Sequence, residues 1–118
     1  MSNGTLPISI ETLMEQCGGM APVVSSVLEE FLTQVSTDVG EMETKLAGGD
    51  PLAASKAAHR LKGTAGVLGA SKLHSLCAAV EMAGREGRTD DAVQSLTELK
   101  VEAQNCVDAI PIIRQQLQ

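Results

Sequence analysis

Aromatic side chains are almost absent from this sequence, which holds one phenylalanine, Phe31, and no tryptophan or tyrosine among its 118 residues. The hydrophobic core must therefore be built from Leu, Val, Ile, Met and Ala, of which Leu and Ala favour helix. No apolar run approaches the roughly 20 residues that a membrane-spanning helix needs, so we expect no membrane anchor. The first ten residues also lack the basic and apolar regions of a signal peptide.

Cysteine is scarce as well. The three cysteines, Cys17, Cys77 and Cys106, are far apart and form no CxxC pair. A disulfide framework or a cysteine metal site is therefore not expected, and a reducing, cytoplasmic location is the simplest interpretation.

Basic residues number only 9 against 15 acidic ones, and the formal net charge is −6. This excess of negative charge makes nucleic acid a poor partner. The distribution is uneven, because residues 51–80 contain no acidic residue and four basic ones, Lys56, Arg60, Lys62 and Lys72. The charge pattern alone leaves two explanations open, chance clustering and a basic surface for an acidic partner.

Apolar residues recur at helical spacing along most of the chain, with glycine or proline at the breaks. The pattern predicts a short helix capped by Ser9, a helix over residues 21–47 and a helix from residue 51 to about 68. A fourth helix starts near residue 71, and Gly84 and Gly87 close it. A fifth helix is capped by Thr89, and Pro111 kinks it or ends it early. We expect an all-α fold, an antiparallel up-down four-helix bundle with a short additional N-terminal helix, forming a single domain over residues 1–118. The methionines, including Met42 and Met82, are expected to fill the core.

His59 is expected on the exposed face of the helix that starts at residue 51. At about 100° per residue, the core stripe consists of Ala54, Ala57, Ala58, Leu61, Ala65 and Leu68. The opposite side carries His59 together with Ser55, Lys62, Gly63 and Gly66. Glycine on an exposed helix face costs about 0.8–1 kcal/mol relative to alanine, and no core-packing argument requires it there. We interpret the two glycines as clearance that lets a bulky partner approach the imidazole.

The chemistry that suits such a residue is phosphoryl transfer. Neutral imidazole is a good nucleophile near neutral pH, and a ring nitrogen can attack phosphorus to form a phosphoramidate. Lys62, one turn further along the same face, can offset the charge of the phosphoryl group. The sequence contains no Walker loop, nucleotide fingerprint or carboxylate cluster for Mg²⁺. The rest of the machinery is therefore expected in a partner, with no cofactor bound by this chain.

The run HRLKGTAGVLG at residues 59–69 resembles the signature of histidine-containing phosphotransfer (HPt) domains. With glycine at about 7% of residues, three glycines at fixed offsets arise by chance in roughly three of ten thousand cases. The likeness extends to the region of Phe31, the break at residues 48–50 and the pair Gly84-Arg85. It implies a phosphoryl carrier without kinase activity of its own. Such a carrier accepts phosphate from a receiver-domain aspartate and passes it to another receiver in a two-component phosphorelay.

The resemblance also assigns roles to residues, with His59 as the phosphoacceptor and Lys62 as its charge partner. Glu81 stands where the family often has Glu or Gln near the active histidine, and Gln34 is a candidate from the adjacent helix. The residues expected at the partner-binding surface are Gly63, Gly66, Ser55, Arg60, Gln34 and Glu81. The partners implied are receiver domains of response regulators or hybrid histidine kinases, which supply Mg²⁺ to a monomeric, cytoplasmic carrier.

Other classes of protein fit parts of the sequence. A plain helical adaptor in which His59 is incidental explains a bundle but leaves the exposed glycines unexplained. The dimerisation and phosphoacceptor domain of a histidine kinase would need two long helices followed by an ATP-binding domain, and a metal enzyme would need inward-facing Glu-x-x-His motifs, which are absent. The second histidine, His74, has no Lys-Gly pair after it and is expected to be structural or simply exposed.

Overall fold

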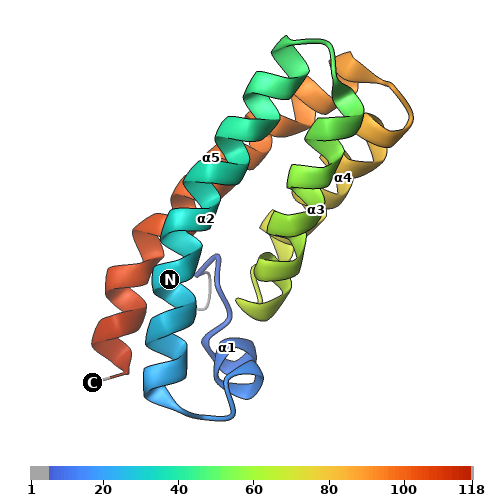
Figure 1. Ribbon diagram of the computed structural model, residues 1–118. Helices are drawn as coiled ribbons and strands as arrows, with labels where there is room; N and C mark the ends of the chain where they lie inside the picture. The colour runs from blue at the N-terminus through green and yellow to red at the C-terminus, as the bar shows by residue number, and fades with distance from the viewer. Residues whose placement is uncertain (1–5, 118) are drawn as a thin grey trace.

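The computed structural model describes residues 6–117, and all regular secondary structure in that range is helical (Figure 1). The helices are α1 (Ile10–Gln16), α2 (Ala21–Ala47), α3 (Pro51–Val67), α4 (Ser71–Arg85) and α5 (Thr89–Gln116). The predicted all-α class is therefore confirmed. Over the same residues, no helix combines the length and the apolar character needed to cross a membrane.

The four longer helices contact one another in a ring. α2 packs on α3, α3 on α4, α4 on α5, and α5 returns to α2. In Figure 1, α2 and α5 run side by side over most of their length, and α3 and α4 lie together against their upper halves. The short α1 contacts α2 and α3 below the loop that joins α3 to α4. The apolar faces of the four longer helices meet inside this ring of helices. Phe31, the single aromatic side chain of the Phe, Trp or Tyr type, is 0% exposed there.

Local sequence signals set most helix ends. The Oγ atom of Ser9 accepts a hydrogen bond from the backbone N–H of Thr12 at 3.1 Å, which confirms the predicted cap of α1. Asp50 caps α3 in the same way, with Pro51 in the first turn. Gly49, just before Asp50, has a φ of +77°, a left-handed conformation in which glycine carries no side-chain penalty.

Of the two glycines predicted to close α4, Gly87 lies just beyond its C-cap with a φ of +72°, which confirms that part of the prediction. Gly84 does not end the helix, which continues to Arg85, and lies inside it as a buried residue. A Cβ atom added to Gly84 would lie 2.5 Å from the carbonyl oxygen of Pro51 and 3.0 Å from the Cβ of Ser55. Gly84 is therefore the point at which α4 crosses closely over the start of α3.

Two predictions about α5 are wrong, the Thr89 cap and the early end at Pro111; the alternative for Pro111, a kink, stays a prediction. Thr89 is the first residue of the helix rather than its cap, because Arg88 occupies the N-cap position without a side-chain cap hydrogen bond. Pro111 does not end α5, which continues to Gln116. Ile110 and Ile113, on either side of the proline, are 2% and 0% exposed, so core packing supports the last turns despite the hydrogen bond that proline cannot donate.

The core stripe predicted for α3 is confirmed, because each of its six members is 0% exposed: Ala54, Ala57, Ala58, Leu61, Ala65 and Leu68. Of the five methionines expected in the core, Met42 is fully buried and Met14 is half-buried, but Met20 and Met82 are 57% and 58% exposed; Met1 lies outside the described residues. Met82 directly follows the buried Glu81 on α4, and its side chain points to solvent instead of filling a gap.

Candidate functional site around His59

His59 lies on the exposed face of α3, as the helical wheel predicts. Its side chain is 62% exposed, whereas Leu61, two residues further on, is fully buried. The imidazole is therefore held by a helix whose other face is anchored in the core, and a partner molecule can reach it.

Ser55 does not belong to this surface, contrary to the sequence prediction. It is 2% exposed, and its hydroxyl donates a hydrogen bond to the carbonyl of Leu52 at 2.6 Å. The wheel treated α3 as an isolated helix, but α4 approaches so closely at Gly84 that it covers this position. Ser55 is thus part of the packing between α3 and α4.

Glu81 on α4 is the residue that holds His59 in place. One carboxylate oxygen, Oε2, lies 2.8 Å from Nδ1 of His59 and 3.0 Å from Nη2 of Arg85. The other oxygen, Oε1, lies 2.6 Å from Nζ of Lys62. The Glu81 side chain is only 5% exposed, so three nitrogen groups converge on one buried carboxylate.

The charge state of Glu81 determines the state of the imidazole. Burial raises the pKa of the carboxyl, but the hydrogen bonds from Lys62 and His59 and the charges of Lys62 and Arg85 lower it more, so that the pKa of Glu81 lies below its usual value of 4.5. An ionised carboxylate can only accept hydrogen bonds. Nδ1 of His59 must therefore carry the hydrogen that Glu81 accepts, which leaves the lone pair of neutral imidazole on Nε2.

Arg60, the residue after His59, turns toward α2 instead. Its Nη2 atom lies 3.1 Å from Oδ1 of Asp38 and 2.9 Å from Oε1 of Glu41. Asp38 is 2% exposed and is a residue that the sequence analysis missed. It lies between the core residues Val35 and Met42 on the buried stripe of α2, where an apolar pattern gives no reason to expect a carboxylate.

Gln34 links α2 to α3 beside the same surface. Its Nε2 atom donates to the backbone carbonyl of Arg60 at 3.2 Å and to Asp38 at 3.1 Å. Its Oε1 atom accepts from the hydroxyl of Thr64 at 2.7 Å. Gln34 thus lies close to the backbone of the His59 helix, and its side-chain groups are used in holding that helix.

Gly63 and Gly66 face open space. A Cβ atom added at Gly63 would meet nothing within 4 Å, and one at Gly66 would meet only Cδ2 of His74, at 3.9 Å. Packing therefore requires glycine at neither position, in contrast to Gly84. His74, which was expected to be either structural or exposed, is exposed on α4 beside Gly66.

Arg85 is the second participant that sequence analysis did not assign to the site. Its side chain is 63% exposed and reaches back one turn along α4 to Glu81. The i, i+4 spacing of an acidic and a basic residue on one helix is a signal for such a pair. That spacing could have found Arg85 once Glu81 was suspected.

The Hpt domain family model matches residues 26–111, from Ser26 inside α2 to Pro111 in α5. The chain belongs to the Hpt domain family. The matched range contains the whole His59 cluster of this Hpt domain, Lys62, Glu81 and Arg85 included. No curated protein matches the chain.

The crystal structure of histidine-containing phosphotransfer protein B (HptB) from Pseudomonas aeruginosa PAO1 has a similar fold, with a TM-score of 0.83 and 20% sequence identity. The similarity covers 97% of this chain and 96% of HptB. It extends the likeness beyond the matched range to nearly the whole Hpt protein, and at this level of identity it concerns the fold alone.

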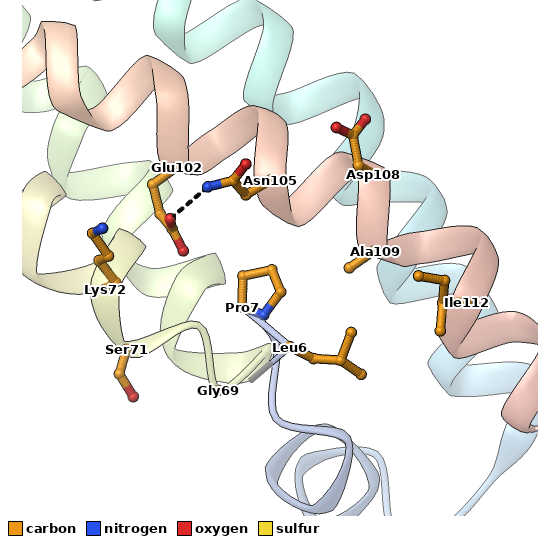
Figure 2. A pocket seen from close by; sticks show the side chains of 10 residues that line it. All are labelled: Leu6, Pro7, Gly69, Ser71, Lys72, Glu102, Asn105, Asp108, Ala109 and Ile112. Carbon is orange, nitrogen blue, oxygen red and sulfur yellow. Dashed lines mark hydrogen bonds between the residues drawn. The ribbon is translucent and has the colours of Figure 1, made fainter. Parts of the chain in front are cut away.

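A cavity of about 590 Å³ lies away from His59, between the segment before α1, the start of α4 and the middle of α5 (Figure 2). It is lined by Leu6, Pro7, Gly69, Ser71, Lys72, Glu102, Asn105, Asp108, Ala109 and Ile112. The buried Glu102 in its wall accepts a hydrogen bond from Asn105 at 3.1 Å (Figure 2). Among residues 6–117, no group of three or more His, Cys, Asp or Glu side chains is arranged to hold a metal ion.

Proposed function

We propose that this Hpt protein carries a phosphoryl group on Nε2 of His59, accepts it from an aspartate of one receiver domain and passes it to an aspartate of another. Membership of the Hpt family gives the general role, histidine phosphotransfer in a phosphorelay. The observation that supports His59 as the acceptor is its bond to Glu81. That bond directs Nδ1 toward the protein, while the side chain as a whole stays 62% exposed.

The proposed step needs no proton transfer. The Nε2 lone pair attacks the phosphorus of an aspartyl phosphate, and the N–P bond forms as the P–O bond to the aspartate breaks. The electron pair of the P–O bond leaves with the aspartate carboxylate. Nδ1 keeps its proton, so the ring becomes positively charged, and the ionised Glu81 stabilises that charge at 2.8 Å. The reverse step returns the phosphoryl group by the same path, as a carrier requires.

The remaining machinery is proposed to come from the partner. Phosphoryl transfer depends on positioning and on neutralising charge, and Mg²⁺ in the receiver domain would do both. This chain supplies the nucleophile and an open face over Gly63 and Gly66, where an added Cβ atom would meet little or nothing. It also supplies a basic stretch, since residues 51–80 contain no acidic residue. Gln34, Arg60 and the exposed edge of this face are proposed to contact the receiver, with no cofactor bound by the chain itself.

We further propose that residues 1–118 act as a single, monomeric domain in the cytoplasm, built as an antiparallel up-down four-helix bundle with α1 as an addition. The ring of contacts among α2, α3, α4 and α5 supports the bundle. The cysteines support the location, because all three are free and buried, as suits a reducing compartment.

A receiver panel tests this function. Receiver domains phosphorylated with a small-molecule donor are mixed with the protein, and the label is then chased with a second, unphosphorylated receiver. A carrier takes the label and gives it up to the second receiver. A helical adaptor would bind a receiver in a pull-down assay and acquire no label from any member of the panel.

A further inference from the structure

Three donors share the two oxygens of Glu81, and they are not equally placed. Lys62 is 27% exposed and is the partner of Oε1, while Arg85 is 63% exposed and shares Oε2 with His59. The two cations thus differ both in their freedom to move and in what their departure would leave behind.

Departure of Lys62 would be costly. Glu81 is 5% exposed, and among the described residues Lys62 is the partner recorded for Oε1. A buried carboxylate oxygen left without a donor carries the full cost of desolvation. Departure of Arg85, in contrast, leaves Oε2 still bonded to Nδ1 of His59. Of the two cations, Arg85 is therefore the easier one to release.

Arg85 is also close to the reacting ring. Its Nη2 atom and Nδ1 of His59 contact the same oxygen, so the guanidinium lies beside the imidazole. A phosphoryl group on Nε2 carries two negative charges, only one of which the positively charged ring offsets, and Arg85 beside the ring is 63% exposed. Guanidinium matches phosphoryl oxygens with two parallel donors, which an ammonium group cannot do.

We infer that Arg85 leaves Glu81 and pairs with the phosphoryl group of phosphorylated His59, while Lys62 remains on Glu81 and keeps the imidazole in place. This inference rests on the proposed function. It exchanges the roles expected from the sequence, in which Lys62 was the charge partner of the phosphoryl group. Lys62 becomes a positioning residue that acts through Glu81, and Arg85 becomes the residue that contacts the phosphoryl group.

The test uses ³¹P NMR on the full chain, phosphorylated directly with the phosphodonor phosphoramidate so that no receiver is needed. The pH titration of the phosphohistidine signal is compared among wild type, Arg85→Gln, Arg85→Lys, Lys62→Gln and Arg88→Gln. Arg88 is the matched control, because it is an exposed arginine that pairs with Glu86 and Asp91 away from His59. A nearby cation favours the doubly charged phosphoryl group and so lowers its titration midpoint.

Arg85→Gln should raise that midpoint by roughly half a pH unit, the shift expected from one exposed ion pair. Arg85→Lys should restore most of the shift, and Arg88→Gln should leave the midpoint unchanged. Lys62→Gln should leave it nearly unchanged but alter the ¹⁵N signal of Nδ1 in the unphosphorylated protein. A midpoint that moves in Lys62→Gln and not in Arg85→Gln would overturn the inference while leaving His59 as carrier. Absence of any phosphohistidine, with phosphoramidate and with receivers alike, would overturn both proposals.

Discussion

Nδ1 of His59 on α3 and Oε2 of Glu81 on α4 are 2.8 Å apart, although the two residues are separated by 22 positions in the sequence. This bond crosses from α3 to α4, the neighbouring helix in the ring. It couples the state of the His59 imidazole to a buried charge, because an ionised Glu81 requires hydrogen on Nδ1. Lys62 and Arg85 favour the ionised form of Glu81, so the whole cluster leaves the lone pair of the neutral imidazole on Nε2.

The pH dependence of stability should report on Glu81. Its pKa in the folded protein is lower than its usual 4.5, so its stabilising contribution is present above about pH 4.5 and is lost as the pH falls through the folded-state value. Glu81→Gln should therefore be less stable than wild type at pH 7, by about 1–2 kcal/mol, since Lys62 and Arg85 lose a charged partner. Urea unfolding at pH 7, 5, 4 and 3 measures the difference. The gap should narrow below pH 4.5, and a constant gap down to pH 3 would show that Glu81 is not held ionised.

Gly63 should be dispensable for folding and necessary for transfer. Gly63→Gln places a side chain in open space and removes a helix penalty of about 1 kcal/mol, so the free energy of unfolding should rise or hold. Transfer from a phosphorylated receiver should fall sharply, because the new side chain occupies the surface beside His59. Gly63→Ala should give a milder version of the same result.

Gly84→Ala is the control for this prediction. The added methyl would meet the Pro51 carbonyl at 2.5 Å, so the α3–α4 contact must shift and the protein should lose about 1–3 kcal/mol of stability. Thermal melts and transfer rates on both variants separate the two kinds of glycine. Transfer at the wild-type rate by Gly63→Gln would show that clearance is not the role of Gly63.

Much of this fold could be predicted from the sequence, because helix starts, glycine breaks and the apolar stripe of α3 are local signals. The failures occur where one helix meets another. Ser55 lies on the exposed side of an isolated wheel, yet α4 covers it, because Gly84 lets the two backbones approach closely. Pro111 carries a helix-ending signal that the burial of its isoleucine neighbours overrides. Contacts between helices determined both of these outcomes, and the pattern of residues along a single helix does not reveal such contacts.

The site was predictable to a similar depth. His59 and its glycines could be identified from spacing along a single helix, and Glu81 was located by the family resemblance. Arg85 and Asp38 were missed, because each is identified only by the residue it pairs with. Arg85 pairs with the buried Glu81, and the buried Asp38 pairs with Arg60 on another helix. A carboxylate inside the buried stripe of α2 contradicts the binary pattern, and the hydrogen bonds that Arg60 and Gln34 donate to Asp38 account for it.

Cys77 and Cys106 should be unreactive in the folded protein. Burial raises the pKa of both Cys77 and Cys106 to about 12, so almost no thiolate exists at pH 8. Iodoacetamide should leave both unmodified in native protein and should alkylate both in 8 M urea. Mass spectrometry of tryptic peptides distinguishes the sites. Stoichiometric alkylation of Cys77 before unfolding would contradict the burial of its sulfur.

The protein alone should not label itself from ATP. The sequence contains no Walker loop or other nucleotide fingerprint, so incubation with radiolabelled ATP and Mg²⁺ should give no phosphoprotein. Addition of a histidine kinase and its receiver domain should produce labelling. Label that appears without them, in a preparation shown to be free of kinase, would mean that the chain has a phosphoryl-transfer activity of its own.

The identity of the phosphorylated atom tests the central claim most directly. Wild type, His59→Gln and His74→Gln are incubated with a phosphorylated receiver, digested at alkaline pH, where phosphohistidine survives, and analysed by mass spectrometry. We predict phosphate on His59 in wild type and in His74→Gln, and none in His59→Gln, whose circular dichroism and melting temperature should match wild type because the side chain lies outside the core. Phosphate on His74, or undiminished labelling of a folded His59→Gln, would contradict the account.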